Sequence, residues 1–112
     1  MRFLMIYHTD HATAEGPPSQ DVVTKMGKFI EESTKAGILL STGGTCGVSY
    51  GTRVRNREGE ITVTDGPFAE AKELVGGYAL MELPSKAAAV EHAQQFLRII
   101  GTGETEIHQL AG

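Results

Sequence analysis

The chain has only one cysteine, Cys46, so no disulfide can form within it. With no competing signal, this favours a reducing, cytoplasmic location. No apolar run approaches the ~20 residues that a membrane-spanning helix needs. The apolar start at residues 1–8 is too short for the core of a signal peptide. We therefore expect a soluble cytoplasmic protein with no membrane partner.

A basic cluster is also missing. Lys and Arg number 10 against 14 Asp and Glu, the formal net charge is −4, and the basic residues are spread along the chain. Proteins that bind nucleic acid usually gather positive charge on one face, so a nucleic-acid partner is not expected. Hydrophobic residues make up 40% of the 112 residues, which is typical of a packed globule. The length fits a single domain over residues 1–112.

Residues 2–8 alternate as a strand with two mostly apolar faces, Phe3, Met5 and Tyr7 on one and Leu4, Ile6 and His8 on the other. This pattern is typical of a strand that is covered on both sides. Helical spacing of apolar residues predicts a first helix over residues 20–36, with Ser19 as its cap and Gly37 after its end. A second helix is predicted between Ser85 and Gly101.

Short apolar or alternating segments predict the remaining strands at residues 38–42, 77–83 and 104–110. Residues 50–65 predict a β-hairpin with a four-residue connection at residues 56–59, which Pro67 ends. Residues 68–74 are expected to form a helical turn or an ordered loop.

The predicted order is strand, helix, strand, hairpin, strand, helix, strand. It matches an α+β fold of ferredoxin-like type, a split βαβ arrangement with an inserted β-hairpin. Both helices then cover one face of the sheet and leave the other bare. A second copy of the chain is the simplest cover for a bare apolar face, so we expect a homodimer closed around a shared interior.

The run Asp65-Gly66-Pro67-Phe68-Ala69-Glu70-Ala71-Lys72-Glu73, followed by Leu-Val-Gly-Gly-Tyr, resembles the signature of the DGPF proteins within the YCII-related group. Residues 2–7 and 54–64 resemble that family too, so the similarity covers nearly the whole chain. The resemblance implies a dimeric α–β barrel. It also implies an enzyme-like cleft with a His–Asp pair. For some members it implies a regulatory context beside alternative sigma factors.

Asp65 is the first candidate for chemistry, as a general acid or base at the end of a strand. The alternative is that its carboxylate accepts hydrogen bonds from its own turn. His8 is the candidate acid–base partner of Asp65. His8 and His11 also have the spacing of two metal ligands, but a third ligand is absent and no metal site is expected.

A second group of residues is predicted to bind a substrate. Glu70 and Glu73 share a face if their segment is helical, although such residues more often form a solvated surface or ion pairs between subunits. The other candidates are Lys72 and Arg53 for an anionic group, and Phe68, Tyr7 and Tyr78 as pocket walls. His92, which we expect off the apolar stripe of its helix, and His108 are interpreted as structural.

The leading hypothesis is a small-molecule enzyme or binding protein whose pocket lies between the bare sheet face and residues 65–73. If the protein is catalytic, acid–base chemistry without a redox cofactor is the natural class, because carboxylates and imidazoles are what the sequence offers. No cofactor is expected. The alternative is a non-catalytic regulatory module, such as one associated with a sigma-factor system. A third is a barrel that binds a hydrophobic ligand without converting it. The sequence alone leaves open whether the protein is an enzyme.

Overall fold

A computed structural model describes residues 1–10, 19–45, 51–66 and 73–111 of the chain. Its elements in chain order are β1 (Arg2–Asp10), α1 (Gln20–Lys35), β2 (Leu39–Gly44), β3 (Thr52–Arg57), β4 (Glu60–Asp65), β5 (Glu73–Glu82), α2 (Lys86–Ile100) and β6 (Glu104–Gln109). Neither helix of this described part is long and apolar enough to cross a membrane.

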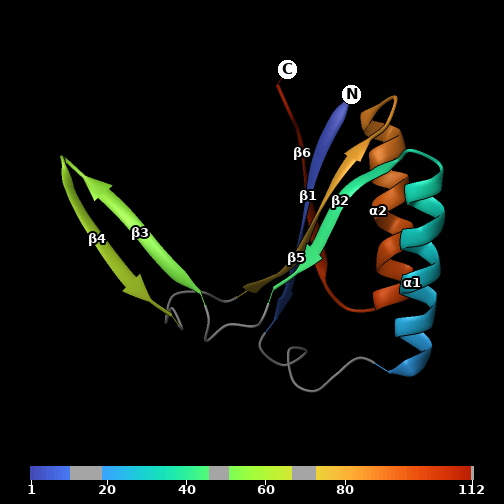
Figure 1. The fold of residues 1–112 in the computed structure, drawn as a ribbon, viewed down its shortest axis with the longest axis horizontal. Coiled ribbons are helices and arrows are strands. Elements are labelled where there is room, and N and C mark those ends of the chain that lie inside the picture. Colours follow the sequence, from blue (N-terminus) through green and yellow to red (C-terminus); the bar gives the residue numbers. More distant parts are fainter. Residues whose placement is uncertain (11–18, 46–50, 67–72, 112) are drawn as a thin grey trace.

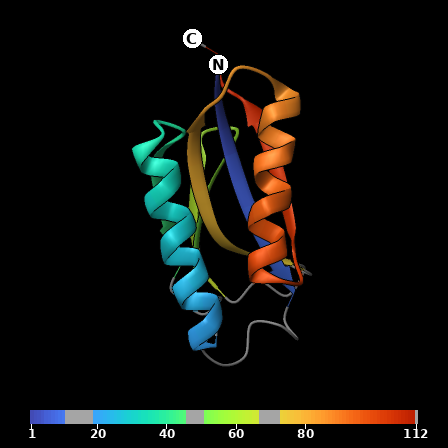
Figure 2. The ribbon, with the colours of Figure 1, turned by 90° about the vertical axis from the view of Figure 1, so that its right-hand side faces the viewer.

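The strands form two separate sheets. Four of them make an antiparallel sheet in the order β2-β5-β1-β6, while β3 and β4 pair only with each other. Both helices lie on one face of the four-stranded sheet, and the β3–β4 hairpin stands apart on the opposite side (Figures 1 and 2). This arrangement confirms the predicted ferredoxin-like α+β fold with an inserted hairpin.

Each helix begins at a serine cap, which was predicted for Ser19. The Ser19 hydroxyl accepts a hydrogen bond from the backbone N–H of Val22 at 3.2 Å, and the Ser85 hydroxyl accepts one from Ala88 at 3.1 Å. These bonds satisfy N–H groups that have no partner within the helix. Gly37 and Gly101 follow the two helices with φ angles of 77° and 95°, which glycine adopts readily.

The core lies between the helices and the sheet and is small. Phe3 and Met81, which are paired across β1 and β5, are fully buried. Ala89 and Ala93 bring α2 close to the sheet because their side chains are short. The buried apolar residues are Phe3, Met5, Met81, Leu83, Ala89 and Ala93, with Ile38, Leu39, Ala79, Ala88 and Ile107 packed against them.

Strand β5 begins earlier than predicted. Its first residues, 73–75, pair with residues 8–10 of β1. Strand β1 itself continues to Asp10, two residues beyond its predicted end at His8. A helical turn over residues 68–74 is therefore wrong for Glu73 and Leu74, because an available strand edge recruits them into the sheet. Residues 68–72 of that prediction lie outside the described part.

The hairpin connection is shorter than predicted. It consists of Glu58 and Gly59, with φ angles of 51° and 89°. Two consecutive positive φ angles are typical of a type I′ turn, whose twist matches that of the flanking strands. The side-chain oxygen of Asn56 accepts a hydrogen bond from the N–H of Gly59 at 3.0 Å. This contact supports the turn and lets Asn56 and Arg57 remain in β3.

Candidate functional site

The sheet face turned away from the helices is the first place to look for a site. Phe3 and Met5 point into the core, and the Tyr7 ring packs edge-on against Phe96 of α2 with centroids 5.3 Å apart. The alternate residues of β1 and their paired neighbours therefore share the other side. We call this the open face; it carries Leu4, Ile6, His8, Ser41, Val75, Tyr78, Leu80, Glu104, Glu106 and His108.

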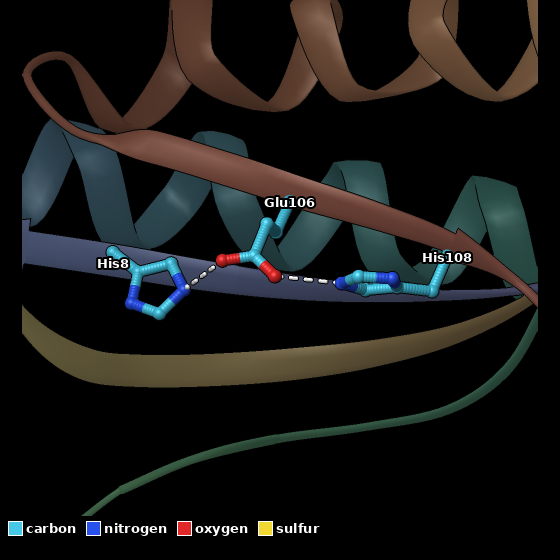
Figure 3. A network of polar contacts seen from close by, with 3 residues as sticks. All are labelled: His8, Glu106 and His108. Atoms are coloured by element: carbon cyan, nitrogen blue, oxygen red, sulfur yellow. Dashed lines mark hydrogen bonds and ion pairs between the residues drawn. The ribbon is translucent and has the colours of Figure 1, made fainter.

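Three polar side chains meet at the β6 side of the open face. The Nε2 of His8 lies 3.1 Å from Oε1 of Glu106, and the Nε2 of His108 lies 2.6 Å from Oε2 (Figure 3). An ionised carboxylate only accepts hydrogen bonds, so each imidazole donates from Nε2. We call His8, Glu106 and His108 the polar row.

The polar row follows from the register of β1 and β6. Along β6, Ile107 packs on the core, so Glu106 and His108 both point to the open face. Glu106 pairs with Ile6 of β1, which places His8 diagonally across from it. Diagonal neighbours on adjacent strands lie within reach of long side chains, and the Glu106 carboxylate therefore bridges both imidazoles.

The electrostatics of the polar row favour an ionised carboxylate. The hydrogen bond from His108 lowers the pKa of Glu106 most, and the charge of His108 and the contact with His8 lower it further, against a smaller opposing effect of lost hydration. The two imidazoles differ in shielding: the side chain of His8 is 18% exposed and that of His108 is 55% exposed. His8 is therefore the more protected of the two.

We expect the pKa of the Glu106 carboxyl group to be lower than that of an ordinary glutamate. A depressed folded-state pKa means that Glu106 stabilises the fold above its unfolded pKa, and that this contribution is lost as the pH falls through the folded value. The pKa should rise in a His108→Val variant and rise less in His8→Val, because His108 makes the stronger contact. Carbon-13 NMR of the side-chain carboxyl measures it. An identical midpoint in all three proteins would contradict this account.

A small cavity lies on the other side of the sheet, beneath the helices. It measures about 60 Å³, and Tyr7, Phe29, Thr42 and His92 are among its lining residues. Pockets that hold drug-sized ligands are larger, about 300 Å³ and above. The cavity is too small for such a ligand, so we place the candidate site on the open face.

His92 is part of this interior. It is buried, its ring stacks on Phe29 with centroids 4.7 Å apart, and its Nε2 lies 3.5 Å from the Ser33 hydroxyl. Burial lowers its pKa, because the charged form loses hydration. The expectation that the apolar stripe of α2 misses His92 is wrong, since a neutral imidazole packs there as a flat ring.

Asp65 lies at the exposed end of β4, at the base of the hairpin. Its carboxylate accepts a hydrogen bond from the Thr52 hydroxyl at 3.0 Å, and the N–H of Gly66 donates to the carbonyl of Gly51 at 2.7 Å. These contacts join the two strands where the hairpin begins. They favour a structural role for Asp65, and its acid–base role stays a prediction.

The other predicted site residues are dispersed. The hydroxyl of Tyr7 donates to the carbonyl of Thr102 at 2.8 Å, and that of Tyr78 lies 2.9 Å from the Ser41 hydroxyl. Arg53 lies on β3, and the backbone of Glu73 begins β5. Three predicted binding residues, Phe68, Glu70 and Lys72, lie outside the described part of the chain. Their contacts with a ligand stay predictions.

Glu106 was not a predicted site residue, and His108 was interpreted as structural. Their spacing of two residues on a strand was a usable signal, because it puts both on one face. The partner His8 lies 98 positions from Glu106 in the chain, and no local pattern connects the two. Across the described residues, no group of three or more His, Cys, Asp or Glu is arranged to hold a metal ion.

Comparison with known protein families gives a match to the YCII-related domain over residues 1–105. This match confirms the resemblance to that group drawn from the sequence. A search of curated proteins finds no matching relative.

Proposed function

The chain belongs to the YCII-related family, and we propose that it binds a small molecule on its open face and performs acid–base chemistry there. The observation that carries this proposal is the polar row, a carboxylate held between two imidazoles on a sheet face without helices. A carboxylate that orients an imidazole is a recurring arrangement in acid–base catalysis.

The roles within the polar row follow from its hydrogen bonds. Glu106 accepts from Nε2 of both imidazoles, which leaves each Nδ1 as a proton acceptor. His8 is the stronger candidate for the base, because it is the more shielded imidazole and lies beside the apolar centre of the face. Glu106 then orients His8 through this hydrogen bond. A substrate with an apolar part over Ile6 and an ionisable proton near His8 fits this layout.

Residues 65–73 complete the proposal as a second wall of the site. Lys72 and Arg53 are the proposed contacts for an anionic group, and Glu70 and Glu73 the proposed polarising groups. These assignments rest on the sequence block and on the position of Asp65 at the hairpin base.

We propose that a second copy of the chain covers the open face. Leu4, Ile6 and Leu80 form its apolar centre, and all three are only partly buried. Apolar patches on a sheet face are typical of surfaces that meet a partner. Sedimentation equilibrium at micromolar concentration should then give about twice the chain mass of 12.0 kDa. A monodisperse monomer would contradict the homodimer.

The acid–base proposal is tested by a thermal-shift screen of metabolites on the native protein and on matched variants. Hits should lose their effect in His8→Asn and Glu106→Gln, which alter the polar row. The same hits should still stabilise the Glu104→Gln variant, which makes the same chemical change as Glu106→Gln on the same strand and face. Hits that stabilise all four proteins equally would place the ligand elsewhere.

A second candidate function is a non-catalytic interaction module. The observation that favours it is the exposed hairpin, where Val54, Ile61 and Val63 face solvent. In that case the His8 and Glu106 variants leave every binding property intact, whereas changes in the hairpin abolish partner binding.

A further inference from the structure

The β3–β4 hairpin makes no strand pairing with the four-stranded sheet of the described chain. It forms a sheet of its own, and Figure 1 shows it set apart from the body formed by the helices and the four-stranded sheet. Every residue of β4 and five of the six residues of β3 are exposed. An isolated two-stranded hairpin is marginally stable in water and needs a further packing surface.

One face of the hairpin supplies an apolar surface for such packing. Val54 pairs with Val63 across the strands, and Ile61 pairs with Asn56 on the same side. Val54 is 67% exposed, Val63 is 66% exposed and Ile61 is 65% exposed. We call them the hairpin stripe. The arginines of β3 lie on the opposite face, paired with Thr64, Thr62 and Glu60.

We propose that the hairpin stripe packs on the open face of a second copy of this chain. The inference rests on the proposed homodimer and assigns the surfaces that meet. Each chain carries both an uncovered apolar stripe and an uncovered apolar sheet face, and Figure 1 shows the hairpin directed away from its own sheet. Two copies related by a two-fold axis exchange their hairpins and cover both surfaces at once.

Size supports a second copy as the occupant. Neighbouring strands lie about 4.8 Å apart, so a two-stranded hairpin covers about half the width of a four-stranded sheet. That half matches the apolar centre at Leu4, Ile6 and Leu80.

This packing makes the candidate site a shared one. A hairpin seated over Leu80 of β5 and over Leu4 and Ile6 of β1 ends beside His8 and leaves Glu106 and His108 on β6 uncovered. The hairpin of the second copy then forms a wall beside His8, and the pocket of each chain is incomplete without its partner. A ligand of the open face would contact both copies.

Disulfide trapping tests the contact directly. All proteins carry Cys46→Ser, which removes the one native thiol. A Val63→Cys chain is mixed with a Leu80→Cys or Ile6→Cys chain and oxidised. We expect a covalent species of about twice the 12.0 kDa chain mass, because disulfides form only between closely apposed cysteines. A Thr62→Cys chain is the matched control, since its side chain points to the opposite face of the same strand.

The trapping result has clear contrary outcomes. Equal yields with Thr62→Cys and Val63→Cys would indicate random collision and overturn the proposal. No covalent dimer in any mixture would also overturn it. Val63→Cys chains could also cross-link to one another more efficiently than to Leu80→Cys chains. That result would show that the hairpin stripes of two copies contact each other, and it would overturn the proposal as well.

Charge substitution on β4 is the second test. The four positions to be changed, residues 61–64, are all exposed, so the substitutions should preserve the fold. The pair Ile61→Lys and Val63→Lys should weaken dimerisation at least about tenfold, because the interface would bury two unpaired charges. The pair Thr62→Lys and Thr64→Lys adds the same charge to the opposite face and should leave the dimer in place. Sedimentation measures both, and circular dichroism checks the fold. Equal dimerisation by the two pairs overturns the proposal.

Failure here is distinguishable from failure of the proposed function. A native dimer without a trapped contact overturns the hairpin exchange and leaves the dimer standing. A native monomer overturns both. In either case the effect of Glu106→Gln on ligand binding is read independently, because Glu106 lies outside the hairpin.

Discussion

Replacing Phe3 with alanine should lower the free energy of unfolding by about 3–5 kcal/mol. Phe3 is fully buried, and its cross-strand partner Met81 is fully buried as well. The loss combines the transfer of the ring out of the core with the cavity that remains. Small domains have a total stability of about 5–15 kcal/mol, so this single change removes a large share of it. Urea unfolding followed by circular dichroism measures the difference.

Val23→Ala is the control for this prediction. Val23 lies on α1 and is 47% exposed, so its truncation should change the stability by less than about 0.5 kcal/mol. Both variants are compared with the native protein at one protein concentration, because dimerisation would couple stability to concentration. A loss below about 1 kcal/mol for Phe3→Ala would mean that the core is not centred on β1.

The fold was largely predictable because its signals are local. Ser19 and Ser85 are helix caps whose partners lie three residues away, and the alternation of β1 assigns its two faces without knowledge of the neighbouring strands. The errors arose where an element depends on a distant one. Glu73 and Leu74 are in a strand because residues 9 and 10 offer an edge for pairing, and nothing within residues 68–74 shows this.

The candidate site was less predictable for the same reason. His8 was identified from its chemistry, but its partner Glu106 depends on how β1 and β6 pair, and that register involves the two ends of the chain. His92 shows the same limitation on a helix. Its burial depends on stacking with Phe29 of another helix, which the periodicity of α2 alone cannot indicate.

The position of Asp65 gives the sequence signature a structural interpretation. Asp65 and Gly66 lie where the hairpin joins the body, and their bonds to Thr52 and Gly51 join its two strands. In the proposed exchange of hairpins, this junction connects the hairpin of one copy to the body from which it reaches the other copy.

Replacing Gly103 with alanine should cost about 2–4 kcal/mol of stability, the sum of two effects. Gly103 has a φ of 151°, which is unfavourable for a residue with a side chain. A Cβ there would also lie 2.6 Å from the hydroxyl oxygen and 2.8 Å from Cζ of Tyr7. The Tyr7 ring cannot yield easily, because its hydroxyl donates to Thr102 and its edge packs on Phe96. Thermal or urea unfolding measures the loss.

Gly101→Ala separates the two effects. Gly101 also has a positive φ, at 95°, but a Cβ there meets no atom within 4 Å. Its replacement carries backbone strain alone and should cost about 1–2 kcal/mol. The remainder of the Gly103 effect is the displacement of Tyr7, so Gly103→Ala should cost less in a Tyr7→Ala background, where the ring is gone. A double-mutant cycle gives this coupling. Additive losses would show that Gly103 acts through its backbone conformation and leaves Tyr7 in place.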